Sequence, residues 1–191
     1  MSFLRQFTYT RVLIACLLLL PFFAISQKSK KSDSKSDKTS PSGSKSNRNA
    51  VFDYKVINAP MPQIRAVYPG KAVYTSNSFQ GPGNLLIMLF NPTCEHCEDM
   101  TIDIIKNIAL FKKTQILLMA TPIMGPYLAG FENDTKLNSC PSIKMGLDSA
   151  GFLDKTFNYV ALPQINIYGP DRKLIRTFNG LETIDSLKPY L

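Results

Sequence analysis

The pattern of apolar and polar positions divides the chain into three parts. Residues 12–25 are almost entirely apolar, residues 27–50 carry almost no apolar side chain, and residues 51–191 alternate apolar runs with turn residues. A segment without apolar side chains buries too little surface to offset the entropy lost on ordering. We therefore expect one folded domain over residues 51–191, preceded by a flexible Ser/Lys-rich tether over residues 27–50.

Two apolar runs in the folded part have the length of buried strands. Residues 85–90 read Leu-Leu-Ile-Met-Leu-Phe, and residues 115–120 form the second run. Between them, residues 98–113 place apolar side chains at nearly helical spacing, with acidic residues at the start and lysines at the end, as the helix dipole favours. This strand–helix–strand order predicts a right-handed crossover and two parallel strands covered on both faces.

The remaining pattern predicts two hairpins, a further strand and three further helices. The expected hairpins pair residues 64–68 with 71–75 around Pro-Gly, and residues 164–168 with 174–179 around Gly-Pro-Asp-Arg. The expected strand is residues 143–147, and the expected helices are residues 124–133, 149–159 and 183–191. In the second of these helices, the side chains expected near one face are Phe152, Leu153, Phe157 and Val160.

A Cys-x-x-Cys motif stands at the junction of the first buried strand and the helix after it. It reads Cys94-Glu95-His96-Cys97, and it contains the one histidine of the chain. A helix N-terminus carries partial positive charge and unpaired N–H groups, which favour a thiolate on Cys94. This is the arrangement that a reversible dithiol needs.

The order of elements, with the cysteine pair at the first crossover, resembles the thioredoxin-like superfamily, and within it the exported redoxins of bacterial envelopes. That group includes the tethered thiol–disulfide proteins of cytochrome maturation. The resemblance covers about residues 60–191, and residues 160–164, Val-Ala-Leu-Pro-Gln, match the cis-proline loop of the family. It implies an α/β protein with a thioredoxin-like fold, three α/β/α layers, a central mixed sheet and an N-terminal hairpin. The chain departs from the family at Thr93, where an aromatic residue is usual, and at Met88, where cytosolic thioredoxins carry a buried aspartate.

The resemblance and the chemistry of thiols together assign roles within the motif. Cys94 is expected to be the exposed nucleophile and Cys97 the buried thiol that resolves the mixed disulfide. His96 is expected to donate a hydrogen bond to the Cys94 sulfur or to place positive charge near it. Glu95 acts in the opposite direction, but we expect it to point into solvent, where screening is strong.

The residues expected to hold a client protein flank the motif in space. The Leu162–Pro163 bond is expected to be cis, so that the backbone of Leu162 offers strand-like hydrogen bonds to a client. Thr93 and Glu95 complete this set of expected client-binding residues. The sequence therefore predicts a protein thiol–disulfide oxidoreductase without a cofactor, acting on thiol- or disulfide-containing clients together with a separate redox partner.

Other functions remain as alternatives. Cys94, His96 and Cys97 contain copper or zinc ligands, but a closed zinc site normally has four, and Cys140 is expected at the far end of the sheet as a free thiol. A peroxidase is disfavoured because no arginine lies between Arg65 and Arg172. An inert disulfide staple is disfavoured because so small a loop constrains the unfolded chain little.

The first residues and the charge distribution indicate where the protein works. Residues 1–26 combine two arginines, an apolar stretch and a small-residue cleavage site, which is typical of a secretory signal; an uncleaved anchor through residues 12–26 is the alternative. The net charge of +8 lies mostly before the folded part, where thirteen basic residues face twelve acidic ones in residues 51–191. We therefore expect no nucleic-acid partner, and we expect an exported monomer in a bacterial periplasm or cell envelope.

Overall fold

The computed structural model describes residues 53–157 and 159–191. The signal and the tether expected in residues 1–26 and 27–50 lie outside the described residues. Within the described part, none of the helices combines the length and the apolar character that crossing a membrane requires.

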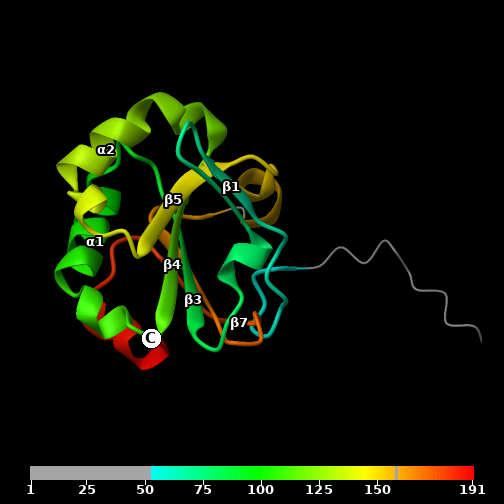
Figure 1. Ribbon diagram of the computed structural model, residues 1–191. Coiled ribbons are helices and arrows are strands. Elements are labelled where there is room, and N and C mark those ends of the chain that lie inside the picture. Colours follow the sequence, from blue (N-terminus) through cyan, green and yellow to red (C-terminus); the bar gives the residue numbers. More distant parts are fainter. Residues whose placement is uncertain (1–52, 158) are drawn as a thin grey trace, which may run out of the picture. The chain divides into compact units, whose positions relative to one another are not determined.

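A seven-stranded mixed sheet forms the centre of the folded part, with the strand order β2-β1-β5-β4-β3-β6-β7 (Figure 1). Its strands are β1 (Arg65–Tyr68), β2 (Ala72–Thr75), β3 (Asn84–Leu89), β4 (Thr114–Ala120), β5 (Ile143–Asp148), β6 (Gln164–Tyr168) and β7 (Leu174–Asn179). The pairs β3–β4 and β4–β5 are parallel, and all other pairs are antiparallel. Both predicted hairpins and the predicted parallel crossover are confirmed.

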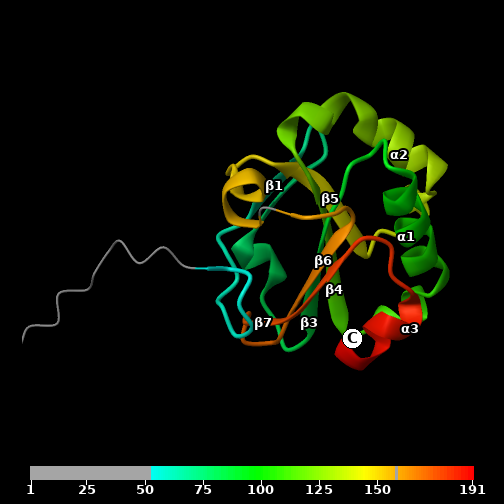
Figure 2. The ribbon, with the colours of Figure 1, turned by 180° about the vertical axis from the view of Figure 1, so that it is seen from behind.

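The two faces of the sheet are covered differently (Figure 2). Helices α1 (Glu95–Lys106), α2 (Leu128–Asp134) and α3 (Ile184–Leu187) pack on one face. The other face is covered by the segment before β1, a 3-10 turn at Ser76–Phe79 and a π-helical turn at Leu153–Phe157. The α/β class is therefore confirmed, but irregular segments rather than long helices form the second outer layer.

Strand β3 lies at the centre of the core. Its five residues from Leu85 to Leu89 are at most 1% exposed. Leu86 and Met88 pack in the layer that contains α1, whereas Leu85, Ile87 and Leu89 pack in the opposite layer. A strand covered on both faces reads as a continuous apolar run, which is why the sequence reveals it.

The helix predicted over residues 98–113 has different ends in the structure. Helix α1 already begins at Glu95, because Cys94 is its N-cap, and Glu95 and Glu98 stand in the first turn. It ends at Lys106, where the Asn107 side chain donates to the Asp103 carbonyl, and a separate 3-10 turn covers Ile108–Phe111. The prediction was right about the helix and wrong about both ends.

The helix predicted over residues 149–159 was wrong in extent. The Asp148 carboxylate accepts hydrogen bonds from the N–H groups of Ala150 and Leu153, and Gly151 adopts a left-handed conformation with φ of 69°. Both features prevent a helix from starting at residue 149. Among the described residues of this range, the helical part is the π-helical turn at Leu153–Phe157, and Val160, expected near the buried face, is 90% exposed.

The other two predicted helices are shorter and partly 3-10. Residues 124–133 fall into a 3-10 segment at Pro122–Tyr127 followed by α2. Pro126 lacks the N–H that a continuous α-helix would use there. The C-terminal helix α3 stops at Leu187 and continues as a 3-10 turn at Lys188–Tyr190.

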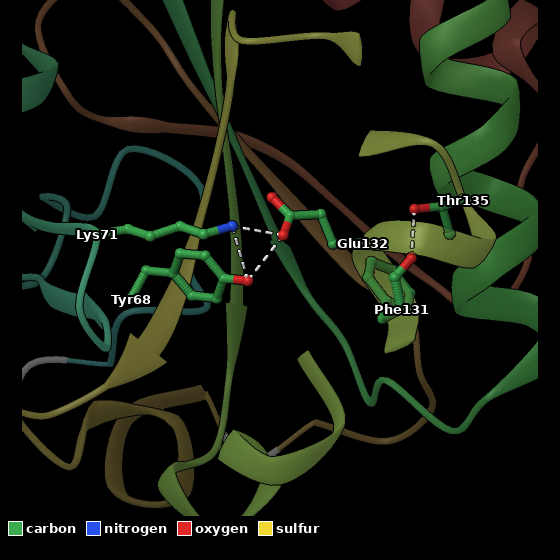
Figure 3. A network of polar contacts seen from close by, with 5 residues as sticks. All are labelled: Tyr68, Lys71, Phe131, Glu132 and Thr135. Atoms are coloured by element: carbon green, nitrogen blue, oxygen red, sulfur yellow. Dashed lines mark hydrogen bonds and ion pairs between the residues drawn. The ribbon is translucent and has the colours of Figure 1, made fainter. Parts of the chain in front are cut away.

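A polar network ties the turn of the β1–β2 hairpin to α2 (Figure 3). The Tyr68 hydroxyl donates to Glu132 Oε2 at 2.9 Å, and the Lys71 ammonium donates to the same oxygen at 2.5 Å. The ammonium also lies 4.2 Å from the centre of the Tyr68 ring. Burial raises the pKa of the Glu132 carboxyl, but the hydrogen bonds from Lys71 and Tyr68 outweigh it, so the net pKa is lowered.

We predict that Glu132→Gln lowers the melting temperature by about 2 °C at pH 7. The folded-state pKa of Glu132 lies below its unfolded-state value. The ionised carboxylate therefore stabilises the wild type above the unfolded-state pKa, and this stabilisation is lost as the pH falls through the folded-state pKa. Thermal unfolding of both proteins from pH 7 to pH 3 should therefore show converging curves. Asp103→Asn, which removes the exposed Asp103–Lys106 pair, is the matched control and should have no measurable effect. Parallel curves for wild type and Glu132→Gln would contradict the prediction.

Candidate active site

The loop between β3 and α1 presents the cysteine motif at the carboxyl end of the parallel strands. The Cys94 carbonyl accepts hydrogen bonds from the N–H groups of Cys97 (2.9 Å) and Glu98 (3.1 Å), and the Cys94 N–H donates to the Asn91 carbonyl at 3.1 Å. The Asn91 side-chain oxygen accepts from the N–H (2.9 Å) and the hydroxyl (3.0 Å) of Thr93. Local hydrogen bonds thus hold the backbone before Cys94.

The two sulfurs of the motif have different environments. Cys94 and Cys97 are both free thiols; Cys94 is partly exposed, whereas Cys97 is 0% exposed and packs in the core with Met100 and Ile104. The pKa of the Cys97 thiol is raised to about 12, mainly by burial; a backbone hydrogen bond from Asn91 acts against this rise, and a side-chain hydrogen bond with Cys94 contributes to it. The structure therefore places a protonated thiol beneath an accessible one.

The two central residues of the motif point outward. Glu95 and His96 are both exposed, and neither side chain makes a hydrogen bond or an ion pair within residues 53–157 and 159–191. The expected exposure of Glu95 is found. The structure does not bring the His96 imidazole into a hydrogen bond with the Cys94 sulfur. Thr93 is also exposed and lies directly before the reactive pair.

The proline loop lies next to the motif. The Leu162–Pro163 peptide bond is cis, the isomer expected from the sequence. Because Gln164 of β6 pairs with Leu89 of β3, the preceding Pro163 lies at the same end of the sheet as Cys94. Leu162 is partly exposed, lines a small cavity with Phe90 and Asn91, and makes no backbone hydrogen bond to another described residue.

Two supporting residues were missed by the sequence reasoning. The Asn91 side chain fixes the turn, and the only available signal was the Asn-Pro-Thr sequence, which favours local side-chain-to-backbone bonds. The ring of Phe131 in α2 lies 4.6 Å from the ring of Phe90 at the base of the loop. Exposed apolar side chains also lie at this end of the sheet: Ile123 and Tyr127 in the 3-10 segment after β4, and Val160 before β6.

Cys140 is separate from this site. It precedes β5, which runs parallel to β4 and β3, so it lies at the opposite end of the sheet from Cys94, as expected. It is 8% exposed, with its sulfur 3.4 Å from the Ser142 hydroxyl oxygen. Within the described part of the chain, no three His, Cys, Asp or Glu side chains are grouped so that they could hold a metal ion.

Comparisons with known proteins find similarity in structure alone. No family model matches the chain, and no curated protein matches its sequence. The thioredoxin domain of a thiol-disulfide oxidoreductase from Bacteroides vulgatus is similar with a TM-score of 0.57 and 16% identity, covering 70% of this chain and 94% of that one. StoA from Bacillus subtilis gives 0.52 and 13%, with 70% and 98% covered.

A secreted disulfide oxidoreductase from Mycobacterium tuberculosis, homologous to E. coli DsbE, gives a TM-score of 0.55 and 18% identity, with 67% of this chain and 93% of that one covered. At such identities the comparison establishes the fold. The chain therefore has the thioredoxin-like fold, which it shares with these bacterial proteins.

Proposed function

We propose that this protein is a thiol–disulfide oxidoreductase that acts on exported proteins through a Cys94–Cys97 dithiol–disulfide couple. The observation that supports it most is the pairing of a partly exposed thiol at the N-cap of α1 with a buried thiol that hydrogen-bonds to it. The positive end of the helix dipole stabilises a thiolate on the outer sulfur, and only the thiolate attacks a disulfide.

In the reducing direction, the Cys94 thiolate attacks one sulfur of a client disulfide. The client S–S bond breaks, a mixed disulfide forms on Cys94, and one client sulfur leaves as a thiolate. Cys97 then gives up its proton, which the leaving client thiolate accepts, and attacks the Cys94 sulfur. The Cys94–Cys97 disulfide forms and the second client sulfur leaves as a thiolate, which takes a proton from water, so two electrons pass to the client; the oxidising direction is the reverse.

The neighbouring residues take supporting roles in this proposal. The free N–H and C=O of Leu162, beside Pro163, bind an extended client segment by strand-like hydrogen bonds. Thr93 and Glu95 contact the client at the outer edge of the motif. His96, when protonated, places a positive charge near the helix end and so favours the thiolate.

The cellular setting is part of the proposal. Residues 1–26 act as a secretory signal, or as an uncleaved anchor through residues 12–26, and residues 27–50 act as a tether for the domain of residues 51–191. The protein then works as a monomer in a bacterial periplasm or cell envelope, where clients form disulfides, and a separate redox partner regenerates it.

Replacing the outer cysteine tests the assignment directly. Cys94→Ser is expected to lower insulin reduction by at least about a hundredfold, since a serine hydroxyl is not a nucleophile toward disulfides near neutral pH. Cys140→Ser is the matched control and should leave the rate unchanged. Cys97→Ser should accumulate a mixed disulfide on Cys94, visible by mass spectrometry without reductant. Activity that survives Cys94→Ser would exclude the proposal.

The burial of Cys97 gives a pH-dependent prediction. In Cys94→Ser, alkylation of Cys97 by iodoacetamide should be nearly absent at pH 8, where a thiol with a pKa of about 12 is roughly one part in ten thousand ionised. The rate should rise about tenfold for each pH unit above this. Rapid alkylation at pH 8 would contradict the prediction.

The same raised pKa also affects stability. It favours the folded state below the unfolded-state pKa near 9, and this contribution is lost as the pH rises from about 9 to about 12. Urea unfolding at increasing pH should show this loss of stability in the wild type and not in Cys97→Ala.

The reduction potential reports both the direction of transfer and the effect of the central residues. A reduction potential of about −120 mV is typical of a disulfide-forming oxidase. A potential of about −270 mV is typical of a thioredoxin-type reductase. His96→Gln removes a charge that favours the reduced thiolate form, so we predict a potential lower by about 10–30 mV. Glu95→Gln is the matched control and should shift it the opposite way. Equal shifts of the same sign would show that these charges do not act on the couple.

A further inference from the structure

A large apolar cavity lies at the end of the sheet opposite the cysteine pair. It has a volume of about 900 Å³ and is bounded by the first residues of β4 and β5, the hairpin strand β2 and the 3-10 turns before β3 and β4. Its apolar wall is formed by Val73, Tyr74, Phe79, Ile108, Phe111 and Ile116. Ligand sites in proteins are typically apolar cavities of about 300–1,000 Å³ with a few polar groups.

The cavity exists because strands β1 and β5 separate at this end of the sheet. Strand β1 pairs with β5 at only two positions, Ala66 with Asp148 and Val67 with Leu147. The first half of β5 therefore has no β-strand partner on that edge among the described residues, and the hairpin diverges from it. Side chains of β2 and of the neighbouring turns face this gap without filling it.

The charged residues of the cavity all carry one sign. Lys112 and Lys144 are in its lining, which contains no Asp or Glu. The Lys144 ammonium donates to the Pro141 carbonyl at 2.7 Å, whereas Lys112 is exposed and makes no hydrogen bond or ion pair with any described residue. An adjoining groove adds Lys113. An anionic group is therefore the electrostatic complement of this cavity.

Thr114 adds a hydrogen-bonding group that has no partner. Its side chain is 8% exposed, it belongs to the lining, and its hydroxyl makes no hydrogen bond within the described part of the chain. A buried hydroxyl without a partner carries a cost of about 1–3 kcal/mol. The oxygen itself is buried in this structure, so a carboxylate ligand would accept a hydrogen bond from it once the Thr114 side chain rotates toward the cavity.

We propose that this cavity binds a free fatty acid. The alkyl chain lies against the apolar wall, and the carboxylate meets Lys112 and Lys144 and accepts a hydrogen bond from Thr114. The site is independent of the Cys94–Cys97 couple, which lies at the other end of the parallel strands. Binding involves no covalent step.

A single tryptophan provides a local probe, because the chain contains none. Val73 lines the cavity and is 52% exposed on the edge strand β2, so Val73→Trp places a fluorophore at the wall with little disturbance of the core. Titration of this full-length variant with dodecanoate should give a saturable emission shift at one ligand per chain. Dodecyltrimethylammonium, with the same chain and the opposite charge, should bind at least about tenfold more weakly.

Two sets of substitutions localise the binding. Lys112→Gln with Lys144→Gln should weaken dodecanoate binding about fivefold to tenfold, and Thr114→Val should weaken it about threefold or more. The matched control, Lys106→Gln with Lys155→Gln, removes the same charge elsewhere and should bind as the parent does. Calorimetric titration of the same variants without the tryptophan repeats the comparison if Val73→Trp does not fold.

Five results would overturn the proposal, four of them from the titrations themselves. The first two are the absence of any saturable emission shift and equal binding of the cationic and anionic amphiphiles. The third is an equal emission shift from a tryptophan at the other end of the sheet, in Leu181→Trp. The fourth is emission of the Val73→Trp variant that changes with protein concentration, because this would indicate that a second copy of the chain occupies the cavity. A shift with phosphatidylglycerol vesicles instead of dodecanoate would also overturn it in favour of a membrane surface. Insulin reduction by the lysine variants is expected to be unchanged, so failure here is distinguishable from failure of the redox proposal.

Discussion

The double-sided burial of β3 is the constraint on which the site depends. The strand is paired on both edges, by β4 and β6, and its side chains alternate between two core layers. A shift of one residue would send every side chain to the wrong layer, so the register and the end point of the strand are fixed. Cys94 follows that end after a loop of four residues, 90–93, and the β3–β6 register brings Pro163 to the same edge. The site is assembled mainly by strand pairing, with few contacts among its own residues.

The difference between the two sulfurs follows from helix geometry. The N-cap residue of a helix borders the loop and can face solvent, whereas a residue about one turn further can face the core. Cys94 and Cys97 occupy these two positions, which leaves one thiol open to a client and the other protonated inside the apolar layer. Such an arrangement gives an ordered reaction, because the inner sulfur has a nearby electrophile only after the outer one has reacted.

Prediction from the sequence succeeds where the signal is local. The bounds of β6 (Gln164–Tyr168) and β7 (Leu174–Asn179) are found because a Gly-Pro-Asp-Arg turn separates two short apolar runs, and the cysteine pair is visible as a motif. It fails where a side-chain hydrogen bond overrides the apolar pattern, and where a contact forms only in the folded chain. The Asp148 carboxylate accepts from the Leu153 N–H, which a helix begun at residue 149 would bond to the Ser149 carbonyl, and Phe131 reaches Phe90 only in the folded chain. The cavity at the opposite end cannot be foreseen either, since it depends on where two strands separate.

That separation depends on how closely β1 approaches β5 in its paired half. A Cβ added to Gly146 would lie about 3.0 Å from the Val67 nitrogen and 3.1 Å from the Ala66 carbonyl carbon, so a glycine is what permits the close pairing there. Towards the start of β5 the pairing ends, and the hairpin moves away from the sheet. Parallel strands bring their carboxyl ends to one edge, where the reactive loop is held tightly. The amino ends of these strands do not position the reactive loop. The cavity at those ends can therefore bind a ligand without altering the strand register on which the position of Cys94 depends.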